Sequence, residues 1–316
     1  MSRRSETVSA EECIALGSSQ RLLESYPNRE LNLGALAISR ALPIRDRRLV
    51  GPWCFLDRFG PLTFSEGKPM AVLPHPHIGL QTVTWLHEGE VEHSDSLGSA
   101  SILHPGGVNV MTSGIGITHA EETPREHTGH LNGVQLWTAL PEQHRHAEPG
   151  FVNVGDVPAI ERPAGVVQVF AGNMDGVTSP APYYSPLLGA DIRVHAAQRL
   201  DIPLEPTYEH AVLVMSGDCA LDGENLAERT LFYLGTTRSE AGFSSVAGAR
   251  VLLIGGPPFP ETILMWWNFV ARTPEEIAQA RTDWEEHRRF GDVVAYHGSR
   301  LTAPSLTRFA RPNPLS

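Results

Sequence analysis

Two short pairs of metal-binding side chains, each with one residue between its members, constrain this chain more than any other feature. The first pair is His75 and His77, and the second is His119 and Glu121. On a β strand, alternate side chains point to the same face and lie about 6–7 Å apart. Two facing pairs would supply three nitrogens and one oxygen to a divalent first-row metal and leave positions open for a substrate. The pattern predicts a catalytic metal site held on strands.

The sequence between the two pairs is typical of β structure. Short runs rich in β-branched and aromatic residues alternate with glycine and proline; they are Gln81–Leu86, Ile102–Leu103 and Val108–Val110. An antiparallel barrel brings such distant strands side by side, and small barrels hold a ligand or metal in their mouths. Pro76 has no backbone donor, so we expect it at a strand start or a bulge.

Several segments closely resemble the pirin family of the cupin superfamily. They include HPHIGLQTVTWLHEGEVEHSDSLG from His75 and PGGVNVMTSGIGITHAEE up to Glu122. The resemblance continues in Ser39–Pro61, in Gly133–Pro141 and in the segments LLIGGPPFPETI and FVARTPEEIAQA. It thus covers most of the chain beyond about Leu36. It implies an all-β bicupin, with two antiparallel β-barrels of jelly-roll type and a short C-terminal helix.

The same resemblance implies the site and its chemistry. The metal ligands would be His75, His77, His119 and Glu121, with Fe(II) as the usual metal and Mn, Co, Ni or Cu as alternatives. The implied activity is that of a quercetin 2,3-dioxygenase, in which a planar flavonol reacts with O2 and ring cleavage expels carbon monoxide. Glu121 would then serve both as ligand and as acceptor of the substrate hydroxyl proton.

Two other functions stay open at this point. Pirin-like proteins are also implicated in redox-sensitive regulation, so the chain could be a non-catalytic iron-binding protein that acts through a protein partner. A purely structural metal is the third alternative. An apolar pocket beside the metal would favour the enzyme, whereas a site plugged by side chains would favour the regulator.

Two residues depart from the family pattern. Gln81 stands where many cupins have a carboxylate, and Ile78 stands where close relatives of the pirin type commonly have arginine. The pirin-type site does not use position 81 as a ligand. A neutral amide and a missing cation could nevertheless change how a substrate is oriented.

Other histidines offer weaker alternatives. His144 and His146 repeat the spacing of the first pair, but charged and turn-forming residues surround them, which predicts a loop. Beyond a predicted linker near residues 149–163, His210 follows Glu209 directly, and adjacent residues face opposite sides of a strand. The second barrel is therefore expected to lack a metal.

The chain divides into four predicted parts. Residues 36–155 form the metal-binding barrel, and 160–290 form the second barrel. Residues 1–35 are an expected appendage with a short helix at Glu11–Glu24, and 291–316 an irregular or disordered tail. Within the second part, Thr273 and Glu276 are spaced as a capping box around Pro274, which predicts a helix start.

Composition narrows the functional classes further. The net charge of −11 argues against direct binding to nucleic acid, because such proteins carry a basic surface. The three cysteines, Cys13, Cys54 and Cys219, are widely spaced, which is typical of reduced thiols rather than a disulfide framework. With no apolar run long enough to span a membrane and no signal-peptide core, we expect a cytoplasmic protein.

Overall fold

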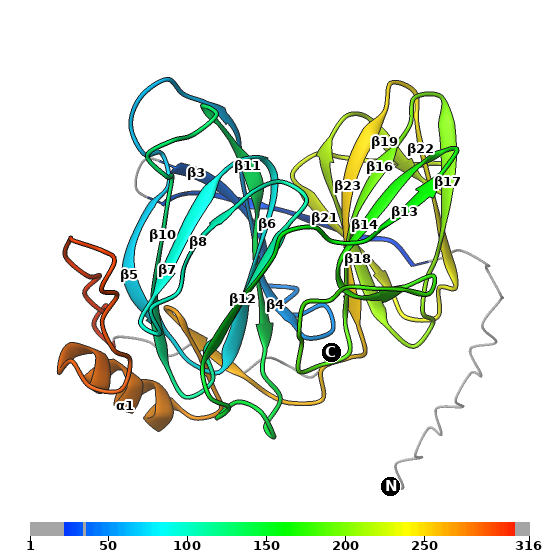
Figure 1. The fold of residues 1–316 in the computed structure, drawn as a ribbon. Coiled ribbons are helices and arrows are strands. Elements are labelled where there is room, and N and C mark those ends of the chain that lie inside the picture. Colours follow the sequence, from blue (N-terminus) through cyan, green and yellow to red (C-terminus); the bar gives the residue numbers. More distant parts are fainter. Residues whose placement is uncertain (1–21, 34–35, 307–316) are drawn as a thin grey trace, which may run out of the picture.

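The structure, a computed structural model, describes residues 22–33 and 36–306. It is nearly all β, as predicted, and Figure 1 shows two halves side by side. Each half is a pair of antiparallel sheets packed face to face in a jelly-roll-like arrangement. This confirms the predicted jelly-roll type of bicupin; within the described residues the edge strands of the two sheets in each half do not pair, so each half is a sandwich of two sheets and not a closed barrel.

The N-terminal half holds both predicted ligand pairs. Its larger sheet has the strand order β12 (Gly150–Val154), β9 (Val108–Thr112), β6 (Leu80–Gly89), β11 (His130–Ala139), β4 (Trp53–Thr63), β3 (Leu36–Leu42) and β2 (Arg29–Leu33). Its smaller sheet has the order β5 (Ala71–His77), β10 (Ile117–Glu122), β7 (Val91–Asp95) and β8 (Ala100–Leu103). The smaller sheet carries the histidines, and the larger one backs them.

The C-terminal half repeats this plan. Its larger sheet runs β1 (Glu24–Pro27), β21 (Thr230–Gly235), β18 (Glu209–Ser216), β23 (Ala249–Gly256), β16 (Leu188–Val194), β14 (Gly165–Met174) and β13 (Ala159–Arg162), with β15 (Val177–Thr178) also paired to β14. Its smaller sheet runs β17 (Gln198–Pro203), β22 (Glu240–Ser245), β19 (Cys219–Leu221) and β20 (Glu224–Leu226). An apolar core that includes Val212, Leu253 and Phe243 fills the space between them.

The two large sheets face each other across an interface with a large apolar cluster. The Trp53 indole N–H lies 3.0 Å from the carbonyl oxygens of Leu188 and Gly255, and Trp85 stacks on Phe170 with ring centroids 5.2 Å apart. Trp53, Trp85 and Phe170 belong to one apolar cluster that draws on both halves. The halves are thus joined by buried side chains.

The start of the described chain belongs to both halves. Strand β1 pairs with β21 of the C-terminal sheet, and β2 pairs with β3 of the N-terminal sheet. The appendage predicted for residues 1–35 is therefore wrong for 24–33, which complete the edges of the two large sheets. The helix predicted at Glu11–Glu24 falls outside the described residues except at its end, where Glu24 begins a strand.

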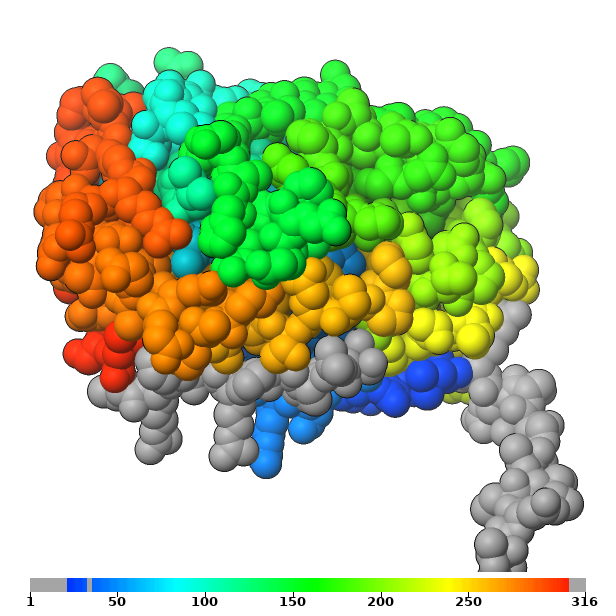
Figure 2. Space-filling view, turned by 90° about the horizontal axis from the view of Figure 1, so that it is seen from below, coloured from blue at the N-terminus to red at the C-terminus, as the bar shows by residue number. Residues whose placement is uncertain are grey.

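The chain returns to the N-terminal half after β23. Strands β24 (Leu264–Trp266) and β25 (Phe269–Ala271) form a hairpin, and α1 (Pro274–Glu285) follows. Figures 1 and 2 place this orange segment at the outer end of the N-terminal half. Phe269 forms a β-bridge with Ile78, and both share an apolar cluster with Trp284 of α1. This segment therefore packs on the first half, although the sequence predicts it within the second.

Helix α1 begins as the capping signal predicts. Thr273 accepts a hydrogen bond from the Glu276 backbone N–H at 3.3 Å, with Pro274 at the first helical position. Ile277, Ala280 and Trp284 form its buried face. No helix in residues 22–33 and 36–306 combines the length and apolar character that crossing a membrane requires.

Residues 291–306 are irregular, as predicted, but they are docked rather than loose. The Trp284 indole donates to the carbonyl of Leu301 at 2.8 Å, and the Leu301 N–H donates to the carbonyl of Pro74 at 2.8 Å. Arg300 lies over the Trp284 ring at 4.0 Å. The tail thereby reaches strand β5 one residue before His75.

Candidate metal centre

Strands β5 and β10 are neighbours, so His119 of the second predicted pair meets both histidines of the first, whereas Glu121 groups with His119 and His93 and not with His75 and His77. His75 lies directly opposite His119 in the antiparallel register, and Ile117 lies opposite His77. The register shifts between His119 and Glu121, which pairs with Val72. Pro76 lies at neither a strand start nor a bulge. It is tolerated because β5 is an edge strand, where a missing N–H can face away from the sheet.

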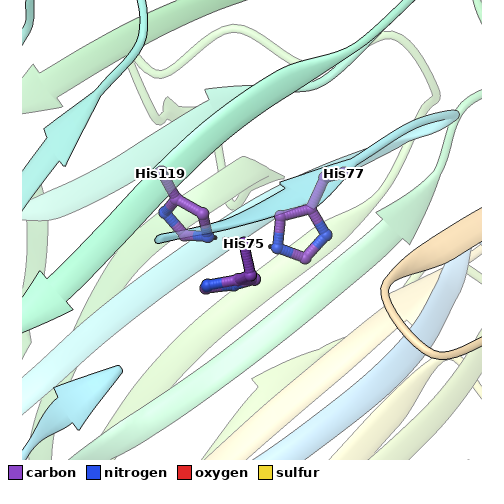
Figure 3. A group of neighbouring side chains, drawn as sticks. All are labelled: His75, His77 and His119. Atoms are coloured by element: carbon purple, nitrogen blue, oxygen red, sulfur yellow. Dashed lines mark hydrogen bonds between the residues drawn. The ribbon is translucent and has the colours of Figure 1, made fainter. Parts of the chain in front are cut away.

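The three histidine rings converge on one point (Figure 3). Their centroids are 4.5 Å apart for His75 and His119, 4.8 Å for His75 and His77, and 4.9 Å for His77 and His119. At least one ring nitrogen of each lies within 4.8 Å of the others. All three side chains are buried.

Hydrogen bonds on the far side of two rings fix their tautomers. His75 Nδ1 lies 2.8 Å from the carbonyl oxygen of Leu73, and His77 Nδ1 lies 3.0 Å from that of Asn268. A carbonyl only accepts, so both Nδ1 atoms carry the proton. The Nε2 lone pairs are left free and point toward the other rings, which is the form in which histidine binds a metal.

Burial also keeps these rings uncharged. It lowers the pKa of His75 to about 4, and it lowers the pKa values of His77 and His119 well below the ordinary value. Neighbouring histidines add to the lowering for His77 and His119. All three are therefore neutral donors at pH 7.

Glu121 lies on the other side of His119. Its carboxylate oxygen and one nitrogen each of His93 and His119 lie within 4.8 Å of one another, so His93 is a further candidate ligand. Thr84 donates to Glu121 Oε1 at 3.0 Å. Burial raises the pKa of Glu121, opposed by His93 and by the Thr84 hydrogen bond. The carboxylate is thus held in place and is more basic than an exposed one.

A cavity of about 430 Å³ opens over the histidines. Its walls are mainly apolar and aromatic, and Phe55 and Trp137 stack within them at 4.0 Å and 11°. Trp267, Asn268 and Leu301 reach it from the returning C-terminal segment. Its size and lining are those of a small-molecule site.

Two family models match this chain. The model described as Pirin covers residues 36–138, and the Pirin C-terminal cupin domain covers residues 189–291. The chain belongs to the pirin family. A pirin-like protein of Caulobacter vibrioides is 37% identical over 270 residues, which are 83% of this chain and 93% of the relative.

Solved structures share the fold of this chain. A crystal structure of quercetin 2,3-dioxygenase from Acinetobacter baumannii is 41% identical, with a TM-score of 0.88 and coverage of 92% of this chain and 97% of that one. An Escherichia coli pirin in complex with nickel(II) is 16% identical, with a TM-score of 0.61 and coverage of 75% and 100%. The second likeness shows the fold alone.

The two departures from the pirin pattern have structural roles. Gln81 donates to Thr112 Oγ1 at 3.0 Å and to the carbonyl of Pro182 at 3.2 Å, so its amide joins the two halves. Ile78 is buried in the apolar cluster around Phe269 and is not among the residues that line the metal cavity. Neither side chain alters the charge of the cavity over the metal site.

The weaker histidine alternatives lie elsewhere. His144 and His146 occupy a turn, as predicted, and His144 contacts the Tyr184 ring at 4.9 Å. His210 is fully buried but joins none of the metal-binding groups in the described residues. Glu209 instead accepts hydrogen bonds from the Gly51 N–H and the Tyr233 hydroxyl, at 2.7 Å each.

Four residues that contact or line this centre were not predicted from the sequence: His93, Asp95, Asn268 and Leu301. His93 and Asp95 have the same spacing as the two predicted pairs, which is the one signal that could have indicated them. Asn268 acts through its backbone carbonyl, and Leu301 acts through its position in an irregular segment. Neither leaves a sequence signal.

Proposed function

We propose that this pirin-family chain is a metal-dependent dioxygenase that opens the ring of a flavonol-like substrate with O2. His75, His77, His119 and Glu121 would hold the metal, and Fe(II) is the proposed ion. The metal would supply a Lewis acid and a redox partner for O2. The named relatives and the chemistry of the donor set support this assignment.

One observation carries the proposal. Nε2 of His77 and Nε2 of His119 lie only 3.1 Å apart (Figure 3). His77 already carries its proton on Nδ1, and both rings are neutral, so the two atoms cannot both donate. His119 Nε2 either donates its proton to the His77 lone pair or, when the His119 proton lies on Nδ1, presents a second lone pair that a cation between the two atoms would bridge. The cluster therefore fits a divalent metal.

Glu121 is the proposed proton acceptor. A flavonol must lose its hydroxyl proton to become electron-rich enough to react with O2. Because burial raises its pKa, Glu121 binds that proton more readily than an exposed carboxylate would. The Thr84 hydroxyl donates to Oε1, so the second carboxylate oxygen is the one left to contact the metal or to accept the proton.

The cavity fits a planar aromatic substrate. The stacked pair Phe55 and Trp137 gives one flat aromatic wall, and Trp267 adds a second indole from the hairpin turn. Leu301, from the docked C-terminal segment, adds a further apolar side chain to the cavity wall. An apolar pocket beside the histidines is the feature that favours an enzyme over a regulator.

The alternative function is an iron-binding regulator. Burial raises the pKa of Cys54 to about 12 and that of Cys219 to about 11, so neither thiol is poised for redox signalling. The open cavity also weighs against this alternative. A protein partner and the cytoplasmic location stay predictions.

The test begins with anaerobic loading of the protein with Fe(II), followed by quercetin and air. We expect loss of the flavonol absorbance with one carbon monoxide released per quercetin consumed. His75→Ala and His119→Ala should each lose iron, measured by elemental analysis, and lose turnover. His144→Ala removes a histidine of the same spacing in a turn and is the matched control.

The iron content and the quercetin turnover of these variants distinguish a dioxygenase from an iron-binding regulator. Full iron content in His75→Ala and His119→Ala would contradict the ligand assignment. Bound iron without consumption of quercetin would leave the metal site standing and shift the assignment to a regulator or to a different substrate.

A further inference from the structure

Asp95 and His93 form a hydrogen-bonded chain that ends on His119. His93 Nε2 lies 3.1 Å from Asp95 Oδ2, and His93 Nδ1 lies 3.4 Å from His119 Nδ1. All three side chains are buried, and the His93 ring stacks on Phe151 at 4.0 Å and 3°. We propose that Asp95 and His93 are positioning residues that hold His119 in the tautomer able to bind the metal. This inference rests on the proposed metal centre.

Asp95 determines which atom donates in the hydrogen bond between His93 and Asp95. Its Oδ1 accepts the backbone N–H groups of Leu97 and Ser99 at 2.9 and 3.0 Å, so this oxygen is fixed in the turn after β7. Only Oδ2 is left to face His93. A carboxylate accepts and does not donate, so His93 Nε2 carries a proton and donates it to Asp95.

The proton on His93 Nε2 leaves His93 Nδ1 to contact His119. In the proposed metal centre His119 binds through Nε2, so its own proton lies on Nδ1, and the adjacent His93 Nδ1 is the atom placed to accept it. His119 keeps its proton on Nδ1, and its Nε2 is free to face His75 and His77. This gives His119 the orientation that backbone carbonyls give the other two rings.

The arrangement also explains why His93 is not a ligand itself. Its Nε2 is occupied by Asp95, and its Nδ1 by His119. The grouping of His93 with His119 and Glu121 therefore reflects a supporting contact. The Phe151 ring keeps the imidazole plane fixed, so the direction of the contact to His119 is fixed too.

Replacing Asp95 by asparagine tests the direction. The amide oxygen of Asp95→Asn would keep the Leu97 and Ser99 N–H groups, and its NH2 would face His93 Nε2. His93 would then carry its proton on Nδ1, donate to His119, and drive the His119 proton to Nε2. Since that nitrogen could no longer bind a metal, we expect affinity for Co(II), used as an air-stable probe, to fall about 10–100-fold.

Asp95→Ala separates this role from a structural one. Alanine removes the turn contacts as well, so it should be the less stable variant by thermal unfolding. It leaves the His93 tautomer free, however, so it should bind Co(II) more tightly than Asp95→Asn. Asp95→Ala should thus be less stable than Asp95→Asn but bind Co(II) more tightly. If Asp95 had only a structural role, the less stable variant would also be the weaker Co(II) binder. Glu92→Gln, on the same strand, is the control and should change neither.

A second readout does not depend on metal. In metal-free protein labelled with ¹⁵N-histidine, His93 Nε2 should resonate as a protonated nitrogen in the wild type and as an unprotonated one in Asp95→Asn. An unchanged resonance, or equal Co(II) affinity in wild type and Asp95→Asn, would overturn the inference. If the wild type binds no metal, the proposed centre fails, while the resonance still tests the tautomer.

Discussion

Asp191 lies between the two halves, and its charge holds them together. It is 1% exposed. Its Oδ2 accepts the Trp85 indole N–H at 2.8 Å, and Arg250 Nε lies 2.8 and 2.9 Å from its two oxygens. His87 Nε2 lies 2.7 Å from Oδ2, without the alignment of a hydrogen bond. Asp191→Asn keeps the shape of this side chain and removes the charge.

The size of the effect follows from the pKa. Burial raises the pKa of Asp191, but His87 and Arg250 more than offset it and lower the pKa from 3.8 to about 2. At about 1.4 kcal/mol for each pKa unit, this contributes about 2 kcal/mol to folding. A depressed pKa stabilises the fold above the unfolded-state value, and the contribution is lost as the pH falls toward the folded-state value.

We therefore expect Asp191→Asn to unfold with a free energy about 2 kcal/mol below that of the wild type at pH 7. The difference should shrink as the pH falls from about 4 toward about 2. Urea unfolding followed by tryptophan fluorescence measures both. Asp201→Asn, an exposed aspartate paired with Arg199, is the control and should change stability by less than about 0.5 kcal/mol. Equal stability of Asp191→Asn and wild type at pH 7, or a difference that persists at low pH, would refute the reasoning.

Two further predictions concern the metal site. Glu121→Gln should retain iron through the three histidines and lose at least about 100-fold in quercetin turnover, because the amide cannot accept the proton; unchanged turnover would remove Glu121 as the base. Leu301→Trp should fill the opening of the cavity and weaken quercetin binding, measured by fluorescence titration, with no change in iron content. An unchanged quercetin affinity would show that Leu301 does not border the substrate.

The local features of this fold could be predicted from the sequence. Alternation along a strand places the two members of each ligand pair on one face, and Thr273, Pro274 and Glu276 mark the start of α1 correctly. These signals work because each depends on backbone geometry over a few residues. They do not specify which strand pairs with which, so the meeting of β5 and β10 rested on the family resemblance.

The contacts that complete the site could not be predicted in this way. Asn268 contributes a carbonyl that any residue possesses, and it lies 191 positions from His77. Strand β1 was not predicted, because Pro27 was interpreted as the end of a helix. Proline is nevertheless tolerated in β1, which lies at the edge of its sheet. Long-range contacts through the backbone carry no side-chain signature.

The return of the C-terminal segment has a consequence for how the protein matures. Translation makes the four proposed ligands early, but the carbonyl that orients His77 and a leucine of the cavity wall belong to residues 268 and 301. A nascent chain that has just released its first half from the ribosome thus lacks the hydrogen bond that fixes one imidazole. The proposed metal centre is therefore complete only when nearly the whole chain has been synthesised.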